Sequence, residues 1–94
     1  MPVVTSFEAQ EERFIATAIE LGLTFAQIAR TEYSFGDEQG GVVAQARAAQ
    51  TCAGVERRVT AAEARGRLHD NLRARLRLLH DALEGVAWHA RKVA

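Results

Sequence analysis

The chain has 94 residues, 48% of them hydrophobic, and its formal net charge is zero. This length fits a single helical domain over residues 1–94, and the zero net charge argues against strong non-specific binding to nucleic acids or acidic membranes. The sequence has no signal-peptide pattern and no run of about 18 apolar residues that would span a bilayer. We therefore expect a soluble, cytoplasmic protein with no membrane partner.

The stretch from Phe7 to Phe35 carries a strong helical pattern. Large apolar residues recur every seven positions, and two of them are followed by an apolar residue four positions later. This spacing is typical of one apolar face of a long helix. The residues expected to be buried in the core by this face are Phe14, Leu21, Phe25 and Ile28. The face is widened by Ile15, Ile19, Ala26, Ala29 and Tyr33.

Capping and turn residues predict the bounds of the first two helices. A capping box at residues 5–8 predicts a helix over residues 6–34. Gly36 suits the left-handed position that ends a helix, and Asp37 suits the cap that begins the next one. We expect a second helix over residues 38–59, which forms an antiparallel hairpin with the first.

The second helix is rich in small residues, which let helix backbones approach closely. Its end stays open between two alternatives. Thr60 begins another capping box that would start a third helix at Ala61, whereas Gly66 suits the end of a longer second helix. We expect the break between residues 59 and 66. The expected inward-facing residues are Val42, Ala46, Ala49 and Ala53, flanked by Cys52, Val55 and Val59.

The third helix carries the second strong apolar stripe, whose residues alternate in steps of four and three. The stripe consists of Leu72, Leu76, Leu79, Leu83, Val86, Ala90 and Val93. We expect it to pack against the apolar face of the first helix. The predicted fold class is therefore all-α: an elongated three-helix bundle made of a long antiparallel helical hairpin plus a third helix.

Residues 25–48 contain a large-large-small set, then a turn, then two small residues in the next helix; these are Phe25, Ile28 and Ala29, then Gly36 and Asp37, then Gly41 and Ala48. In these residues the chain resembles the helical hairpin of the tetratricopeptide-repeat family. It departs from the family pattern in having one copy, a first helix of twice the usual length, and Glu32 and Gln45 where aromatic residues are common. The resemblance implies a role in protein–protein interaction and no catalysis.

The three histidines suggest no metal site, because only His80 and Glu84 have the i, i+4 spacing of paired ligands, and two ligands are too few. We expect no metal and no other cofactor. The sequence around His80 is also similar to histidine phosphotransfer domains, which are helical bundles with an exposed histidine. Here Leu83 and Gly85 come one residue late, and Glu84 stands where a lysine would stabilise the phosphoryl group. A phosphotransfer-like module stays as one alternative function.

No nucleophile–base pair, carboxylate pair or phosphate-binding loop is present, so the sequence predicts no enzymatic activity. The single cysteine, Cys52, excludes an internal disulfide and fits a reducing compartment. It has no histidine or basic cluster near it in the sequence. We expect a packed core thiol.

Charge is divided unevenly between the two halves of the chain. Residues 1–45 hold two arginines and seven acidic residues, and residues 46–94 hold ten basic and five acidic residues. One interpretation is that acidic and basic helices pack together; the alternative is an accessory protein that binds nucleic acid through its basic C-terminal half. Against this alternative, helical spacing scatters the run of arginines around the helix instead of gathering it on one face. The run is Arg65, Arg67, Arg73, Arg75 and Arg77.

Two large apolar residues of the third helix lie off its main stripe, Leu78 and Trp88. Either they pack within the subunit, or they form a second apolar surface for a partner. The chain is short and much of its apolar content is alanine, which favours self-association. We predict a homodimer or larger oligomer, and a non-catalytic role through protein–protein contact. The predicted interface residues are Leu78, Ala82, Gly85 and Trp88.

Overall fold

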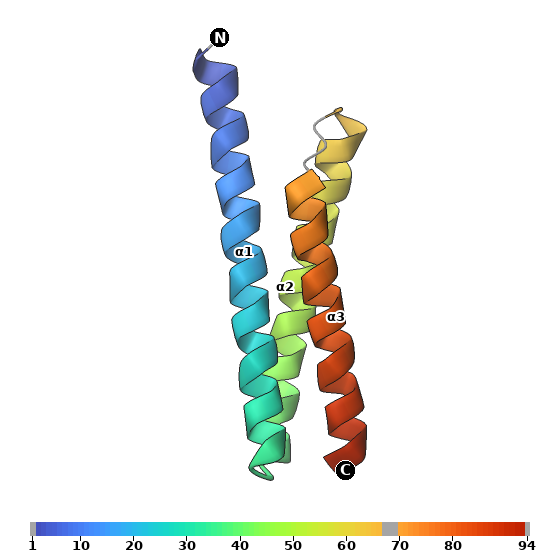
Figure 1. Ribbon diagram of the computed structural model, residues 1–94. Helices are drawn as coiled ribbons and strands as arrows, with labels where there is room; N and C mark the ends of the chain where they lie inside the picture. Colours follow the sequence, from blue (N-terminus) through green and yellow to red (C-terminus); the bar gives the residue numbers. More distant parts are fainter. Residues whose placement is uncertain (1, 67–69, 94) are drawn as a thin grey trace.

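Three long helices make up most of the chain. The computed structural model describes residues 2–66 and 70–93, with the side chains of residues 9–66 and 71–92. The helices are α1 (Pro2–Ser34), α2 (Glu38–Ala64) and α3 (Asp70–Val93). α1 and α2 form an antiparallel hairpin, and α3 runs back alongside both (Figure 1). The predicted all-α three-helix bundle is confirmed.

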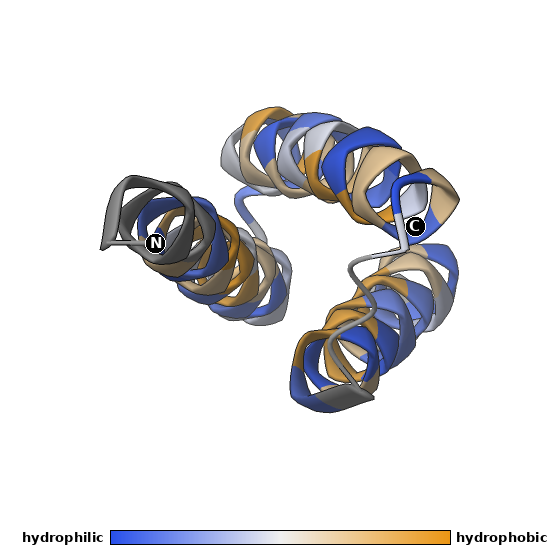
Figure 2. Ribbon diagram, turned by 90° about the horizontal axis from the view of Figure 1, so that it is seen from above, coloured by the Kyte–Doolittle hydropathy of each residue, from blue (hydrophilic) through white to orange (hydrophobic). Residues whose placement is uncertain are grey.

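The bundle is elongated. It measures 53 × 17 × 16 Å along its principal axes, with a radius of gyration of 15.3 Å, against about 12 Å for a compact domain of this length. The 33 residues of α1 set this long dimension, since a helix rises about 1.5 Å per residue. Viewed along the bundle, the three helices surround a common centre (Figure 2).

The turn between α1 and α2 follows the sequence prediction. Gly36 has a φ of 83°, a left-handed conformation that glycine adopts at little cost. The N–H of Asp37 donates to the carbonyl of Glu32 at 2.8 Å. The Asp37 carboxylate accepts from the N–H of Gly40 at 2.9 Å, which caps the start of α2.

The two capping boxes do not mark helix starts. α1 begins at Pro2, so Thr5 lies inside that helix, and Thr60 lies inside α2. α2 continues to Ala64 because Val59 and Ala62 are buried in the bundle, and tertiary packing outweighs a local capping preference. The prediction of a third helix from Ala61 is wrong. The alternative is confirmed, since Gly66 follows the end of α2 with a φ of 77°.

The apolar stripe of α3 is confirmed as core. Its largest buried members are Leu72, Leu76, Leu79 and Val86. Leu83 and Ala90 are half-buried and pack against the same core. The side chain of Val93 lies outside the described residues.

The buried face of α1 is formed mainly by the residues that were expected to widen the apolar face, and not by the large residues expected at its centre. Phe14, Leu21 and Ile28 are 53%, 49% and 42% exposed, and Phe25 is half-buried. The true core face is rotated by about one residue, or 100°. Its members are Ile15, Ile19, Gly22, Ala26, Ala29 and Tyr33.

Small residues explain this rotation. A Cβ atom added at Gly22 would lie 3.0 Å from a methyl group of Leu79 on α3, closer than ordinary van der Waals contact. Gly22, Ala26 and Ala29 thus allow both neighbouring helices to approach α1 closely. The bundle gains close backbone packing along this face and leaves the larger side chains outside.

The inward face of α2 agrees with the prediction only in its flanking residues, Cys52, Val55 and Val59, which are buried. Val42, Ala46, Ala49 and Ala53 are exposed. The ring of Tyr33 packs directly on Gly41, where an added Cβ would lie 2.6 Å from a ring carbon. The Tyr33 hydroxyl donates to Oε1 of Gln45 at 2.7 Å. This contact turns a different face inward, formed by Gly41, Ala44, Ala48, Cys52, Val55, Val59 and Ala62.

Candidate functional site

The most unusual surface of the bundle is the row of large apolar side chains along the outside of α1. Phe14, Leu21 and Ile28 are spaced by seven residues, so they lie on nearly the same side of the helix. All three are more than 40% exposed, and Phe35 continues the row beyond the end of α1 at 83% exposed. Single exposed apolar residues are normal, but a contiguous row marks an interaction surface.

Two shallow depressions lie beside this row, between α1 and α2. One, of about 500 Å³, is lined by Phe25, Ile28 and Val43 among others. The second, of about 510 Å³, is lined by Phe14, Ala18 and Gly54 among others. We call the row and the two depressions together the α1–α2 groove; its apolar members are Phe14, Ala18, Leu21, Phe25, Ile28 and Val43.

Two arginines of α2 reach over aromatic rings of α1 in this groove. The guanidinium carbon of Arg58 lies 4.3 Å from the centroid of the Phe14 ring, and that of Arg47 lies 5.8 Å from the Phe25 ring. Such cation–π contacts contribute about 0.5–1 kcal/mol at exposed sites. They link α2 to α1 and place positive charge along the groove.

The two ends of the groove differ in charge. Arg57 and Arg58 line the depression beside Phe14, whereas Glu32 and Asp37 line the one beside Ile28. The hydrogen bond to Asp37 is the main cause that raises the pKa of Glu32, and desolvation and the Asp37 charge add to it. The N–H of Gly40 and then the hydrogen bond with Glu32 lower the pKa of Asp37. Arg47 lines the same depression, so this end of the groove carries two carboxyl groups beside one arginine, whereas the residues that line the Phe14 end include two arginines and no acidic residue.

The predicted interface on α3 is a smaller apolar patch. Leu78 and Trp88 are 60% and 54% exposed, so neither packs within the core. Gly85 is exposed, while Ala82 is half-buried and packs against the core. The ammonium of Lys92 lies 4.7 Å from the Trp88 ring centroid. That a partner covers these residues stays a prediction.

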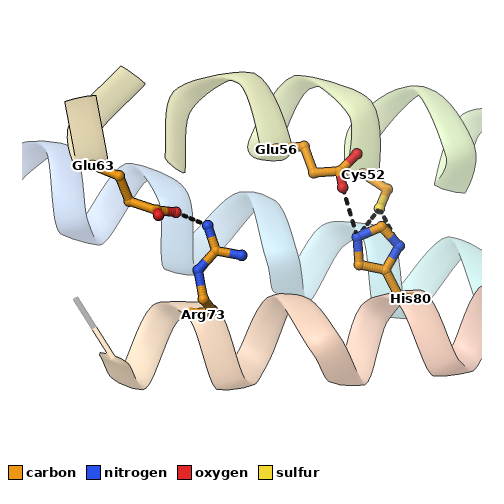
Figure 3. A network of polar contacts seen from close by, with 5 residues as sticks. All are labelled: Cys52, Glu56, Glu63, Arg73 and His80. Atoms are coloured by element: carbon orange, nitrogen blue, oxygen red, sulfur yellow. Dashed lines mark hydrogen bonds and ion pairs between the residues drawn. The ribbon is translucent and has the colours of Figure 1, made fainter. Parts of the chain in front are cut away.

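A cluster of Cys52, His80 and Glu56 forms where α2 meets α3 (Figure 3). The sulfur of Cys52 lies 3.8 Å from Nδ1 and 3.9 Å from Nε2 of His80. Nε2 of His80 lies 3.0 Å from the Glu56 carboxylate. Sequence reasoning missed this cluster because the cysteine and the histidine are separated by 28 residues. The only signal was that both lie beside core positions, His80 next to Leu79 and Cys52 within the apolar face of α2.

The cluster has the residue types of a nucleophile, a base and an orienting carboxylate, but its setting opposes that chemistry. Cys52 is only 4% exposed. Burial raises the pKa of its thiol, and the charge of Glu56 adds to the effect. A nucleophilic cysteine needs the opposite, an accessible thiolate. The arrangement fits a packed thiol beside a surface ion pair.

No metal centre is assembled either: in the described part of the chain, no three His, Cys, Asp or Glu side chains are placed to hold an ion together. His89 instead shares a hydrogen bond of 3.0 Å with the Ser34 hydroxyl. His69 lies outside the described residues.

Two arginines of the basic half form ion pairs within the bundle. Arg65 pairs with Glu11 of α1 at 3.2 Å, and Arg73 pairs with Glu63 (Figure 3). The first contact joins the acidic half of the chain to the basic half, as one interpretation of the charge distribution expected, whereas Glu63 and Arg73 both lie in the basic half. Arg67 lies outside the described residues.

Comparison with known proteins finds no family model, curated protein or solved structure that matches this chain. Within residues 2–66 and 70–93, no helix has both the length and the apolar character needed to cross a membrane.

Proposed function

We propose that this chain is a small non-catalytic helical protein that acts through protein–protein contact, including self-association, in the cytoplasm. The observation that carries the proposal is the exposed row of Phe14, Leu21 and Ile28. A folded bundle leaves such a row in water only at a cost, which a partner that covers it would remove. The resemblance of residues 25–48 to a tetratricopeptide-repeat hairpin supports the same role.

Two observations weigh against the alternative functions. Arg65 and Arg73 are engaged by carboxylates, which lowers the positive charge available for nucleic acid. The carboxylate of Glu56 lies against His80, and it would repel a phosphoryl group on that ring. A nucleic-acid accessory role and a phosphotransfer role are therefore less well supported than protein contact.

Light scattering at micromolar concentration tests the proposal. We expect a mass of at least twice the 10.3 kDa of one chain. A mass of 10.3 kDa at every concentration would contradict the proposed self-association. Retention on immobilised nucleic acid that weakens steeply with salt would favour the basic alternative instead.

A further inference from the structure

We infer that the α1–α2 groove is the contact surface between two copies of this chain, which lie antiparallel across a two-fold axis near Leu21. The inference rests on the proposed function, because it names the partner and the surface of the self-association proposed above. The spacing of the apolar residues and the charges along the groove support it.

The spacing along α1 is that of a helix–helix seam. Phe14, Leu21 and Ile28 repeat at seven residues, and Ala18 and Phe25 follow the first two at four residues. This is the a and d pattern by which one helix packs along another. The buried face of α1, about 100° away, packs on α2 and α3, and Ala18 and Phe25 of the seam also contact that core. Phe14, Leu21 and Ile28 stay exposed, so a helix of a second copy can pack along them.

The charges at the two ends select a second copy in the antiparallel direction. Arg57 and Arg58 lie at the Phe14 end, whereas Glu32 and Asp37 lie with Arg47 at the Ile28 end. Antiparallel copies bring the arginines of each subunit to the carboxylates of the other, whereas parallel copies place like charges together. A surface that complements itself in this way is what a two-fold interface requires.

The same axis also matches the apolar residues. Leu21 is midway between Phe14 and Ile28 in the sequence. A two-fold axis beside Leu21 therefore places it opposite its own copy and places each Phe14 opposite the Ile28 of the other chain. Both large side chains then contact an apolar partner.

The long side of the whole molecule measures 53 by 17 Å, an area of about 900 Å² in projection. A stable protein interface buries about 800 Å² on each partner, so the contact between copies must extend beyond the apolar groove over most of this side. The α3 patch has fewer large apolar side chains on one side of its helix. Leu78 and Trp88 are ten residues apart and point in directions about 80° apart around the helix.

Matched charge substitutions on the two surfaces form the first test. We expect Leu21→Glu to raise the dimer dissociation constant at least about tenfold, measured by sedimentation equilibrium. Leu78→Glu makes the same chemical change at a similarly exposed residue of α3 and should leave the constant unchanged. Circular dichroism of both variants checks that the bundle is intact. Loss of the dimer in Leu78→Glu alone would overturn the inference and favour the α3 surface.

Cross-linking tests the direction and the register. Leu21→Cys should give a covalent dimer with a short bismaleimide. Phe14→Cys alone should not, because two Phe14 residues are about 21 Å apart in the antiparallel arrangement. Mixed Phe14→Cys and Ile28→Cys chains should cross-link again. The wild type, whose only cysteine is the buried Cys52, controls for background.

The outcomes separate this inference from the proposal on which it rests. A dimeric wild type in which Phe14→Cys cross-links to itself shows a parallel pair and overturns the inference alone. A dimeric wild type that Leu21→Glu does not weaken also overturns the inference alone. A monomeric wild type overturns both the inference and the proposed self-association, and leaves the groove to a different protein.

Discussion

α1 and α3 carry apolar stripes of similar regularity, yet the bundle uses them in opposite ways. The leucines of α3 lie in the core, with Leu72 and Leu79 almost fully buried. The large residues of α1 lie outside it, with Phe14 and Leu21 about half exposed. Both stripes satisfy the same test of helical spacing. The comparison teaches that spacing identifies an apolar face without saying what covers it.

The difference lies in the size of the buried residues, because α1 and α3 each contact both of the other helices. α1 packs against two helices, and close approach on both sides needs small residues such as Gly22 and Ala29 in the middle of its buried face. α3 instead buries one stripe of leucines in the core of the bundle. The other apolar face of α1 then stays exposed, and we propose that it contacts another chain.

The largest expected effect separates the two stripes directly. Leu79→Ala should lower the free energy of unfolding by about 2–5 kcal/mol, because it opens a cavity in the core. Leu21→Ala should change it by no more than about 0.5 kcal/mol in the monomer, as an exposed site does. Urea unfolding followed by circular dichroism, at a concentration below that of association, provides both values. Equal losses in the two variants would mean that the α1 row is core after all.

The helices of this fold were predictable from the sequence because their signals are local. Gly36 and Asp37 marked the turn, and the leucine spacing of α3 marked its buried face. The buried face of α1 was not predictable in the same way, because the pattern was weighted by large residues such as Phe14. The core instead depends on how closely backbones approach, which is decided by Gly22 and Gly41 against partners distant in sequence.

The candidate functional site was also predictable from the sequence only in part. Leu78 and Trp88 were expected to lie off the main stripe of α3, because the angle of a residue around a helix follows from its position in the sequence alone. The α1–α2 groove was missed, since it appears only when the true inward face of α1 is known. The contact of Cys52 with His80 was missed as well, because it joins two helices at residues that are 28 positions apart in the sequence.

A smaller effect tests the close packing of the inner faces. Gly41→Ala places a methyl group against the Tyr33 ring, which cannot move easily because its hydroxyl bonds to Gln45. Overpacking costs about 1–3 kcal/mol, and the gain in helix propensity offsets about 1 kcal/mol of it. We expect a net loss of stability in thermal and urea unfolding. A variant more stable than the wild type would show that the ring can shift and that Gly41 is not needed for the α1–α2 contact.

The same change on α3 should have the opposite sign. A Cβ atom added at Gly85 meets no other atom within 4 Å, so Gly85→Ala gains up to about 1 kcal/mol of helix propensity without strain. The expected result is a higher midpoint of urea unfolding and an unchanged dissociation constant. If the substitution weakens association instead, the α3 patch, and not the α1–α2 groove, is the contact between copies.

The smallest effect concerns Glu32, which lies where the exposed row of α1 reaches the acidic end of the groove. Asp37 raises the pKa of Glu32 above its usual 4.5, so the folded state favours the protonated form. Its contribution to stability is full below pH 4.5 and is lost as the pH rises through the folded pKa. The pKa of Asp37 is lowered below its usual 3.8, so its own contribution is present above that value and is lost as the pH falls through the lowered pKa.

Glu32→Gln separates these two contributions, because the amide can still donate a hydrogen bond to Asp37 and carries no charge. We expect a slightly higher melting temperature than the wild type at pH 7, and a difference that disappears as the pH falls toward 4. Glu20→Gln, at an exposed position on the other side of α1, controls for the loss of one charge. If Glu32→Gln melts below the wild type at pH 7, repulsion from Asp37 is not the main influence on Glu32. The Glu32 carboxylate would then stabilise the fold at neutral pH. Arg47 lines the same depression, and it would be the basic residue to replace next.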